Sequence, residues 1–326
     1  MTVPSTLTAA VTPPAAAVGL AARAVGLRRT FGSTVAVDGI DLDVPTGSVL
    51  GMLGPNGSGK TTLIRMLLGL TRADAGSAEL LGHPMPDEAA RALPHVGALV
   101  EGPGFHPFLS GRENLLRVAA TEPLLDGREI PGAVDAALMR VGLADAAGRR
   151  FRGYSLGMKQ RLGLAGALLL PRRLVVLDEP TNGLDPAGTR DVRRIIGELH
   201  DAGSTVIVSS HLLAEVEATC THVAVLQAGS LVAAGELAVL LESGTGGLDV
   251  ATPDVDLALG TLRDAGITAY LANGDEPGVV VAEDGPPTAD TIALLVRAGV
   301  TVHEARRRRA RLEELFARLT ERSLSE

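Results

Sequence analysis

The sequence predicts an α/β fold: a parallel sheet with an antiparallel β layer and a helical insertion, followed by a small C-terminal α+β domain. Three observations support this prediction. A short apolar run at 48–53 leads through a glycine-rich turn into a helix-patterned segment. Two more apolar runs, at 174–177 and 205–208, flank another helix-patterned segment. A Gly-rich break at 244–247 then introduces a second, shorter series of elements.

The composition is that of a folded chain with an acidic surface. The 326 residues are 46% hydrophobic and 21% charged, which is enough for one large core or two smaller ones and excludes disorder of the whole chain. The formal net charge is −8, and the aromatic side chains are 5 Phe, 2 Tyr and no Trp. Because protein surfaces that bind nucleic acid are basic and stack the bases on aromatic rings, we expect no nucleic-acid partner.

Three features of the sequence favour a cytoplasmic location without a membrane span. They are the N-terminal segment, the hydropathy and the cysteine content. Residues 1–17 are rich in Ala, Thr and Pro, and the first basic residue is Arg23. A secretory signal begins with basic residues, so we expect a disordered leader instead. The stretch 218–235 lacks Asp, Glu, Lys and Arg, but polar residues interrupt it, so we expect no transmembrane helix. Cys220 is the only cysteine and cannot form an internal disulfide, which favours a reducing, cytoplasmic setting.

The elements before residue 240 are predicted from apolar spacing. Residues 19–44 alternate short apolar segments with Gly and Asp, which is typical of antiparallel strands. The run 48–53 predicts a buried strand, and helical spacing from residue 60 to 68 predicts the next helix. Helical spacing between about 111 and 170 predicts an insertion. The runs at 174–177 and 205–208 then predict a βαβ unit with parallel strands.

The segment 241–326 is predicted to be a separate accessory domain of βαββαβ order with a final helix. We expect its strands near residues 248, 269, 279 and 300, and its helices at 257–265 and 288–298. The final helix is expected to carry a basic run beside an apolar stripe, which indicates a solvated basic face over a packed stripe. Contact with anionic lipid or partner loops is the alternative. The residues of the run are 306–309, and those of the stripe are Leu312, Leu315, Phe316 and Leu319.

A phosphate-binding motif occupies the first glycine-rich turn. The sequence from Gly54 to Thr61 satisfies G-x-x-x-x-G-K-[ST] and lies between a predicted strand and a predicted helix, the context that the motif requires. Backbone N–H groups of such a loop cradle phosphates, while the Lys reaches the β and γ phosphates and the Thr hydroxyl binds Mg²⁺. The nucleotide-binding residues are therefore expected to be Gly54, Pro55, Asn56, Gly57, Ser58, Gly59, Lys60, Thr61 and Thr62.

Two adjacent carboxylates end the apolar run at 174–177. Asp178 is expected to hold Mg²⁺, and Glu179 is expected to polarise the attacking water. An acidic helix cap after a strand is the alternative for an isolated Asp-Glu pair. The phosphate-binding motif upstream favours phosphoryl-transfer chemistry instead.

The ordered set of motifs resembles the ATP-binding-cassette (ABC) ATPases, a P-loop NTPase family. Besides the two motifs above, Tyr154–Met158 followed by Lys-Gln-Arg resembles the family's signature motif. Residues 182–185 resemble its D-loop, and His211 resembles its switch histidine. The resemblance implies an ABC ATP-binding domain at 18–240, with ATP and Mg²⁺ as its cofactors.

The resemblance also implies roles for the matched residues. Lys60, Glu179 and His211 would be catalytic, with His211 hydrogen-bonded to the γ-phosphate. Ser155 and Gly157 would contact the γ-phosphate bound by a second copy of the chain, in a head-to-tail ATP sandwich.

Three further positions belong to the implied ATP site. Asp185 would link the two sites of the sandwich. Phe31 matches the aromatic position that stacks on adenine, and Ala36 lies near a second apolar contact. A core phenylalanine is the alternative for Phe31.

Two parts of the sequence, the signature motif and the position of Glu101, depart from the family pattern. The usual signature is Leu-Ser-Gly-Gly-Gln, whereas Tyr154, Leu156 and Met158 fill its first, third and fifth places here. Glu101 stands where the family has a glutamine that senses Mg²⁺ and couples to the membrane subunit. A carboxylate there can still bind the metal, but it adds negative charge to the site, so slow turnover is expected. Both variants are similar to those of antibiotic, lantibiotic and other drug-type exporters.

The resemblance therefore implies a Mg²⁺-dependent ATPase subunit, peripheral at the cytoplasmic face of the cell membrane, that powers a separate permease chain. Export of a drug, antibiotic or peptide-like compound is expected. The permease would engage a groove near Glu101 and the helical insertion. Two alternatives are a non-transport ABC ATPase and a regulatory module that binds ATP without hydrolysing it. The lack of a second phosphate loop disfavours the first alternative, and Glu179 disfavours the second.

Overall fold

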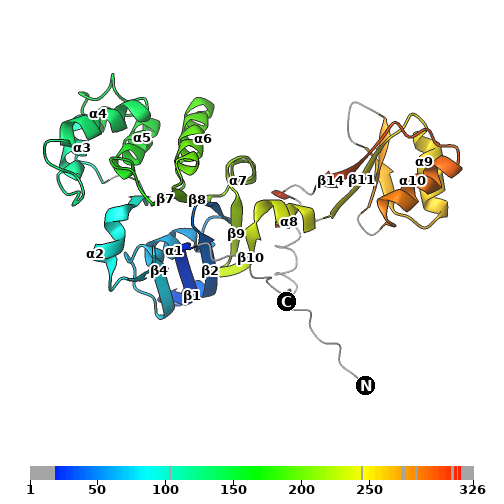
Figure 1. Cartoon of the computed structure of the whole chain (residues 1–326), viewed down its shortest axis with the longest axis horizontal. Helices are drawn as coiled ribbons and strands as arrows, with labels where there is room; N and C mark the ends of the chain where they lie inside the picture. The colour runs from blue at the N-terminus through cyan, green and yellow to red at the C-terminus, as the bar shows by residue number, and fades with distance from the viewer. Residues whose placement is uncertain are drawn as a thin grey trace.

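The computed structural model describes residues 19–102, 104–243, 245–272, 277–282, 285–309, 312–313 and 315–316. These residues form three sheets with helices packed on them, so the predicted α/β class is confirmed (Figure 1). The leader predicted at 1–17 and Leu319 of the predicted final helix lie outside the described residues. No helix in the described part of the chain combines the length and the apolar character that crossing a bilayer requires.

An antiparallel sheet forms the first layer, as the alternation in 19–44 predicts. Its strands, in the order β2-β1-β4-β5, are β2 (Thr34–Pro45), β1 (Leu20–Phe31), β4 (Ala75–Leu80) and β5 (His83–Met85). The β1–β2 hairpin turns at Gly32, whose φ of +60° lies in the left-handed region that glycine adopts at no steric cost. This sheet shares a core with the strand that precedes the phosphate-binding loop and the helix that follows it.

The second sheet is mainly parallel. Its strands, in order, are β10 (Ser230–Glu236), β9 (His222–Gln227), β3 (Val49–Leu53), β8 (Thr205–Ser210), β7 (Leu174–Asp178) and β6 (Val96–Leu99). Only β10 runs antiparallel to its neighbour in this sheet. The predicted βαβ unit is confirmed, because β7 and β8 pair in parallel on either side of α6 (Pro186–Asp201).

Both faces of this sheet are covered, which explains why its strands are continuous apolar runs. In β3, Leu50 and Met52 belong to the core beneath α1 (Lys60–Leu67) and the antiparallel sheet. Val49 and Leu53 point to the other core, which the helical insertion and α6 cover.

The helical insertion predicted between about 111 and 170 consists of α3 (Gly111–Ala119), α4 (Ile130–Arg140) and α5 (Leu156–Ala167). These helices group together at one end of the molecule (Figure 1). A capping box starts α3, since Ser110 Oγ accepts from Glu113 N–H at 3.1 Å and the Glu113 side chain accepts from Ser110 N–H at 2.7 Å. The shorter helices are α2 (Ala89–Ala92), α7 (Leu213–Thr219) and α8 (Leu237–Ser243), with 3₁₀ turns at Leu93–His95 and Phe151–Gly153.

The C-terminal part follows the predicted βαββαβ order. Its elements are β11 (Thr245–Ala251), α9 (Val255–Asp264), β12 (Ala269–Leu271), β13 (Gly278–Val281), α10 (Thr288–Arg297) and β14 (Glu304–Arg309). The sheet order is β12-β13-β11-β14, and α9 and α10 share a small core with it. This sheet lies beyond α8, apart from the other two (Figure 1).

The strand predicted near residue 300 is wrong in position, because the last strand is 304–309 and contains the arginine run that was expected to flank a helix. Leu312 is fully buried in the core of the nucleotide-binding part, with Leu315 and Phe316 packed against it. The division into domains at 18–240 and 241–326 stays a prediction.

Candidate functional site

The site lies where the parallel strands end. Carboxyl ends of parallel strands meet at one edge of a sheet, and ligands bind in the crevice outside that edge. Strand β3 ends at Leu53 before the phosphate-binding loop, β7 ends at Asp178, and β8 ends at Ser210. Residues distant in sequence therefore converge, and Thr61 and Asp178 are in direct contact across this edge.

The loop from Gly54 to Gly59 has the backbone that the motif requires. Gly57 and Gly59 have φ values of +83° and +102°, which other residues rarely adopt. A Cβ at Gly59 would lie 2.4 Å from the carbonyl oxygen of Ala36, so strand β2, which carries Ala36, leaves no room for a side chain at position 59. The first N–H groups of α1 have no intrahelical acceptors, and they create a site for an anion at the end of the loop.

Lys60 is almost completely buried beneath this loop, with 5% of its surface exposed. Its ammonium donates to the carbonyl oxygens of Gly54 at 2.7 Å and Pro55 at 3.1 Å. The same nitrogen lies 3.6 Å from Glu179 Oε1. The structure therefore brings the predicted lysine and the predicted glutamate together at one point.

The hydroxyl of Thr61 and the carboxylate of Asp178 are also brought together. Thr61 Oγ1 donates to Asp178 Oδ2 at 2.8 Å, and Ser209 Oγ donates to Asp178 Oδ1 at 2.5 Å. Magnesium prefers oxygen ligands and is usually held by one or two carboxylates together with substrate phosphates. This pair of oxygen donors, placed beside a phosphate-binding loop, fits that ion.

Glu179 is the centre of the contact network. Its second carboxylate oxygen lies 2.7 Å from His211 Nδ1, so the predicted switch histidine and the predicted base are neighbours. Its N–H donates to Ser209 Oγ at 2.9 Å, and its carbonyl oxygen accepts from Gln160 Nε2 at 3.2 Å. The φ of Glu179 is +48°, a conformation that costs a non-glycine residue free energy and clusters at functional sites.

Sequence reasoning missed the hydrogen-bonding roles of Ser209 and Gln160. Two adjacent serines at the end of the apolar run 205–208 were the available signal for Ser209. Gln160 lies in the first turns of α5, and no pattern in the sequence connects it to the strand that ends at Asp178.

Glu101 lies at the carboxyl end of β6, also with a left-handed φ of +49°. Its carboxylate accepts a hydrogen bond from the guanidinium of Arg65 on α1. Within the described ranges, no hydrogen bond or ion pair joins Glu101 to Thr61 or Asp178. Its predicted part in metal binding stays a prediction.

Of the residues predicted to face a second copy, Ser155 and Asp185 are exposed helix caps and Gly157 is half-buried. Ser155 Oγ accepts from Met158 N–H at 3.2 Å and caps α5, in which Gly157 is the second residue. Asp185 Oδ1 accepts from Gly188 N–H at 2.7 Å and caps α6. In the part of the chain that the structure describes, neither cap bonds to the loop at 54–61. An anion is stabilised at such a helix N-terminus.

The predicted adenine contacts lie on the antiparallel sheet. Phe31 ends β1 with 47% of its surface exposed, and the Arg29 guanidinium lies 4.7 Å from the centre of its ring. The exposed ring rules out the core alternative for Phe31. Ala36 lies on β2, where its carbonyl oxygen packs against Gly59 of the loop.

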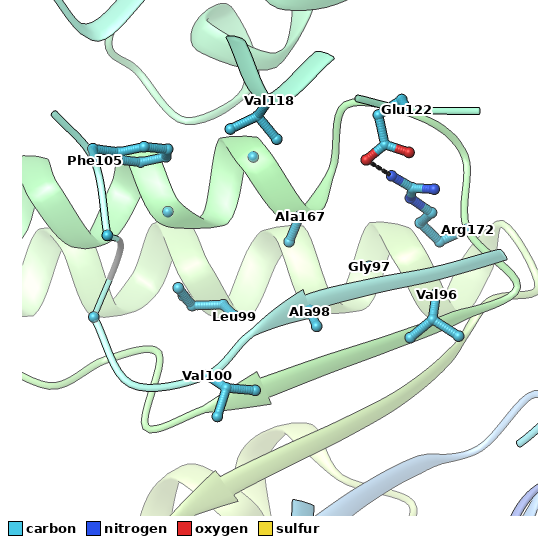
Figure 2. Close-up of a pocket in the computed structure, with 14 residues that line it drawn as sticks. Val96, Gly97, Ala98, Leu99, Val100, Phe105, Val118, Glu122, Ala167 and Arg172 are labelled. Atoms are coloured by element: carbon cyan, nitrogen blue, oxygen red, sulfur yellow. Dashed lines mark hydrogen bonds and ion pairs between the residues drawn. The ribbon is translucent and has the colours of Figure 1, made fainter. Parts of the chain in front are cut away.

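A cavity of about 310 Å³ lies between the edge strand β6 and helices α3 and α5 (Figure 2). Its walls carry Leu99, Phe105, Val118 and Ala167. One end holds an ion pair in which Arg172 Nη2 lies 2.6 Å from Glu122 Oε1. Gly102 and Gly104, which follow Glu101, line the cavity, and engagement of a permease there stays a prediction.

Comparisons with known proteins place the chain among transporter ATP-binding proteins. A protein-family model described as "ABC transporter" matches residues 37–182. The daunorubicin resistance ATP-binding protein DrrA3 of Streptomyces coeruleorubidus is 35% identical over 309 residues, which cover 90% of this chain and 94% of that protein. The bacitracin transport ATP-binding protein BcrA of Bacillus licheniformis is 42% identical over 206 residues, which cover 63% of this chain and 66% of that protein.

The shorter matches leave part of those relatives unaligned. The chain spans 63–66% of the length of three curated relatives that are 42–44% identical to it. Among solved structures, an ATP-binding subunit of an ABC transporter has a TM-score of 0.63 at 25% identity, covering 69% of this chain and 93% of that one.

Proposed function

The chain belongs to the ABC transporter family, and from this premise we propose that it is the ATP-binding and hydrolysing subunit that powers a separate membrane permease. One observation carries the proposal. The carboxylate of Glu179 lies within 3.6 Å of Lys60 Nζ and 2.7 Å of His211 Nδ1, directly beside the contact between Thr61 and Asp178. Such a set of groups supports hydrolysis of a phosphoric anhydride.

Each group has a distinct part in the proposed reaction. The loop N–H groups and Lys60 bind the β and γ phosphates of ATP and stabilise the charge that develops on them. Glu179 orients a water molecule for attack on the γ-phosphate, and His211 holds the Glu179 carboxylate and the γ-phosphate in place. Thr61 and Asp178 would hold Mg²⁺, which would neutralise part of the phosphate charge when bound.

Turnover is proposed to need two copies of the chain. Ser155 and Gly157 present a hydroxyl and the positive end of α5 on an exposed surface. These groups would bind the γ-phosphate held by a second copy, and Asp185 would contact the partner's site. Phe31 and Ala36 would bind the adenine.

The names of the relatives support a class of cargo. One relative is named for bacitracin transport and another for daunorubicin resistance. We therefore assign this chain to the export of a drug, antibiotic or peptide-like compound, at the cytoplasmic face of the membrane. The cavity between β6, α3 and α5 is the proposed seat for a segment of the permease.

Steady-state ATP hydrolysis with Mg²⁺ tests the proposed activity. Because removal of a general base costs about 10²–10⁴-fold, Glu179→Gln is expected to lower kcat by at least about 100-fold. Glu217→Gln, which changes an exposed acid on α7, is the matched control and should hydrolyse ATP at the wild-type rate. Equal rates for the wild type and Glu179→Gln would refute the proposal.

A further inference from the structure

The first turn of α5 and the D-loop contact each other through leucines that rest on glycines. Leu156, the first residue of α5, covers Gly183. A Cβ placed on Gly183 would lie 2.3 Å from Leu156 Cδ2 and 2.9 Å from its Cγ. The leucine thus occupies the space that any side chain at position 183 would need.

A second contact runs in the opposite direction. A Cβ placed on Gly157 would lie 3.2 Å from Cδ2 of Leu184. Each segment therefore supplies one leucine and one glycine, and each leucine packs on the glycine of the other segment. We call the four residues Leu156, Gly157, Gly183 and Leu184 the leucine interlock.

The interlock is continuous with the catalytic centre. Gln160, one turn further along α5, donates to the carbonyl oxygen of Glu179 at 3.2 Å. Two backbone turns make the segment 179–184 compact. Asn182 N–H donates to the Glu179 carbonyl at 3.1 Å, and Leu184 N–H donates to the Thr181 carbonyl at 3.1 Å. The segment that carries Glu179 is therefore attached to the start of α5 at both ends.

The exposure of Leu156 shows that the interlock contributes little to the core. Its side chain lies on the surface that also carries Ser155, with 63% of Leu156 exposed. Burial of a side chain stabilises in proportion to the apolar area removed from water, and here most of that area stays in water. Leu156 instead fixes the position of the D-loop, because it packs directly over Gly183, a glycine with a left-handed φ of +75°.

We propose that Leu156 is a positioning residue, which through the leucine interlock holds the segment 179–185 at one fixed position relative to Ser155. The inference rests on the proposed function, in which Ser155 serves the ATP of a second copy and Glu179 serves the ATP of its own chain. Leu156 then couples the two sites, because a shift of the start of α5 also shifts the backbone of Glu179.

Hydrogen exchange of the full chain without nucleotide tests the interlock directly. In Leu156→Ala, the amides of 181–185 are expected to exchange about tenfold faster, because the contact that limits local opening is lost. Leu156→Met keeps an apolar side chain of similar volume and should exchange as the wild type does. Leu124→Ala, at another exposed leucine of the helical insertion, is the control and should exchange as the wild type does.

Kinetics supply the second readout. Leu156→Ala is expected to lower kcat about fivefold or more and leave KM for ATP within about twofold, since the phosphate-binding loop is unchanged. Leu156→Met should retain the wild-type kcat. Wild-type exchange at 181–185 in Leu156→Ala, or equal effects of Ala and Met, would overturn the proposal. Failure of the proposed function is a separate result, seen as equal rates for the wild type and Glu179→Gln, and the exchange measurement needs no ATP.

Discussion

Replacement of Glu122 by alanine is expected to destabilise the nucleotide-binding part strongly. The side chains of Glu122 and Arg172 are only 16% and 3% exposed, and their charged atoms lie 2.6 Å apart. Arg172 Nη1 also donates to the Pro94 carbonyl at 2.7 Å, while its Nε is buried with no partner among the described residues. The glutamate is therefore the charge that compensates a buried guanidinium.

The magnitude follows from this burial. Removal of one partner of a buried ion pair costs about 3–5 kcal/mol, because it leaves an uncompensated charge. The adjacent cavity of about 310 Å³ can admit water to the guanidinium, so we expect the lower value, about 3 kcal/mol. For a unit of this size, about 2–4 °C per kcal/mol gives a fall in melting temperature of about 6–12 °C.

Thermal unfolding followed by circular dichroism measures this shift. The double variant Glu122→Leu/Arg172→Met replaces both charges by apolar groups and is expected to melt within about 3 °C of the wild type, since such replacements are often neutral. A melting temperature for Glu122→Ala within about 2 °C of the wild type would refute the reasoning, because a guanidinium that needs no compensation is not effectively buried.

Three further predictions concern single groups. Burial raises the pKa of the Cys220 thiol to about 12, so iodoacetamide at pH 8 should label it only in denaturant, and rapid labelling of the native protein would contradict this. Burial lowers the pKa of His222 below its ordinary 6.5, and the negative charge of Glu236 offsets only part of this effect. As the pH falls, the unfolded state therefore binds a proton at this histidine before the folded state does. The melting temperature should therefore fall as pH drops below 6.5, and His222→Gln should reduce that dependence. Ser110→Ala removes the cap of α3 and should cost about 1 kcal/mol in urea unfolding, whereas Ser110→Thr should cost less.

The sequence was sufficient to predict which residues lie together at the candidate site, because they belong to short motifs at the ends of parallel strands. The phosphate-binding loop, Asp178, Glu179 and His211 each follow an apolar run, and a parallel sheet brings such ends to one edge. The proximity of these residues to one another follows from that topology. The contacts of Ser209 with Asp178 and of Arg65 with Glu101 depend on side-chain geometry between distant elements, which no local pattern encodes.

The arginine run at 306–309 shows how local patterns fail in the fold. Four consecutive arginines resemble a solvated helix face, yet they belong to β14, with Arg306 opposite Asp249 of β11. This strand is at the edge of its sheet, where charged residues commonly discourage association with other edges. Backbone pairing with β11, more than fifty residues earlier in the chain, decides the conformation, and the spacing of side chains carries no sign of it.

Recovery of a permease from membranes tests the central proposal most directly. The tagged chain is retrieved from gently solubilised native membranes, and its partners are identified and quantified by mass spectrometry. The account predicts a multi-span membrane protein at near-equal stoichiometry, lost in Val118→Asp, which puts a charge in the cavity, and retained in Leu124→Asp, which puts one outside it. Recovery of soluble partners alone, or of the same membrane protein from both variants in equal amounts, would contradict the account.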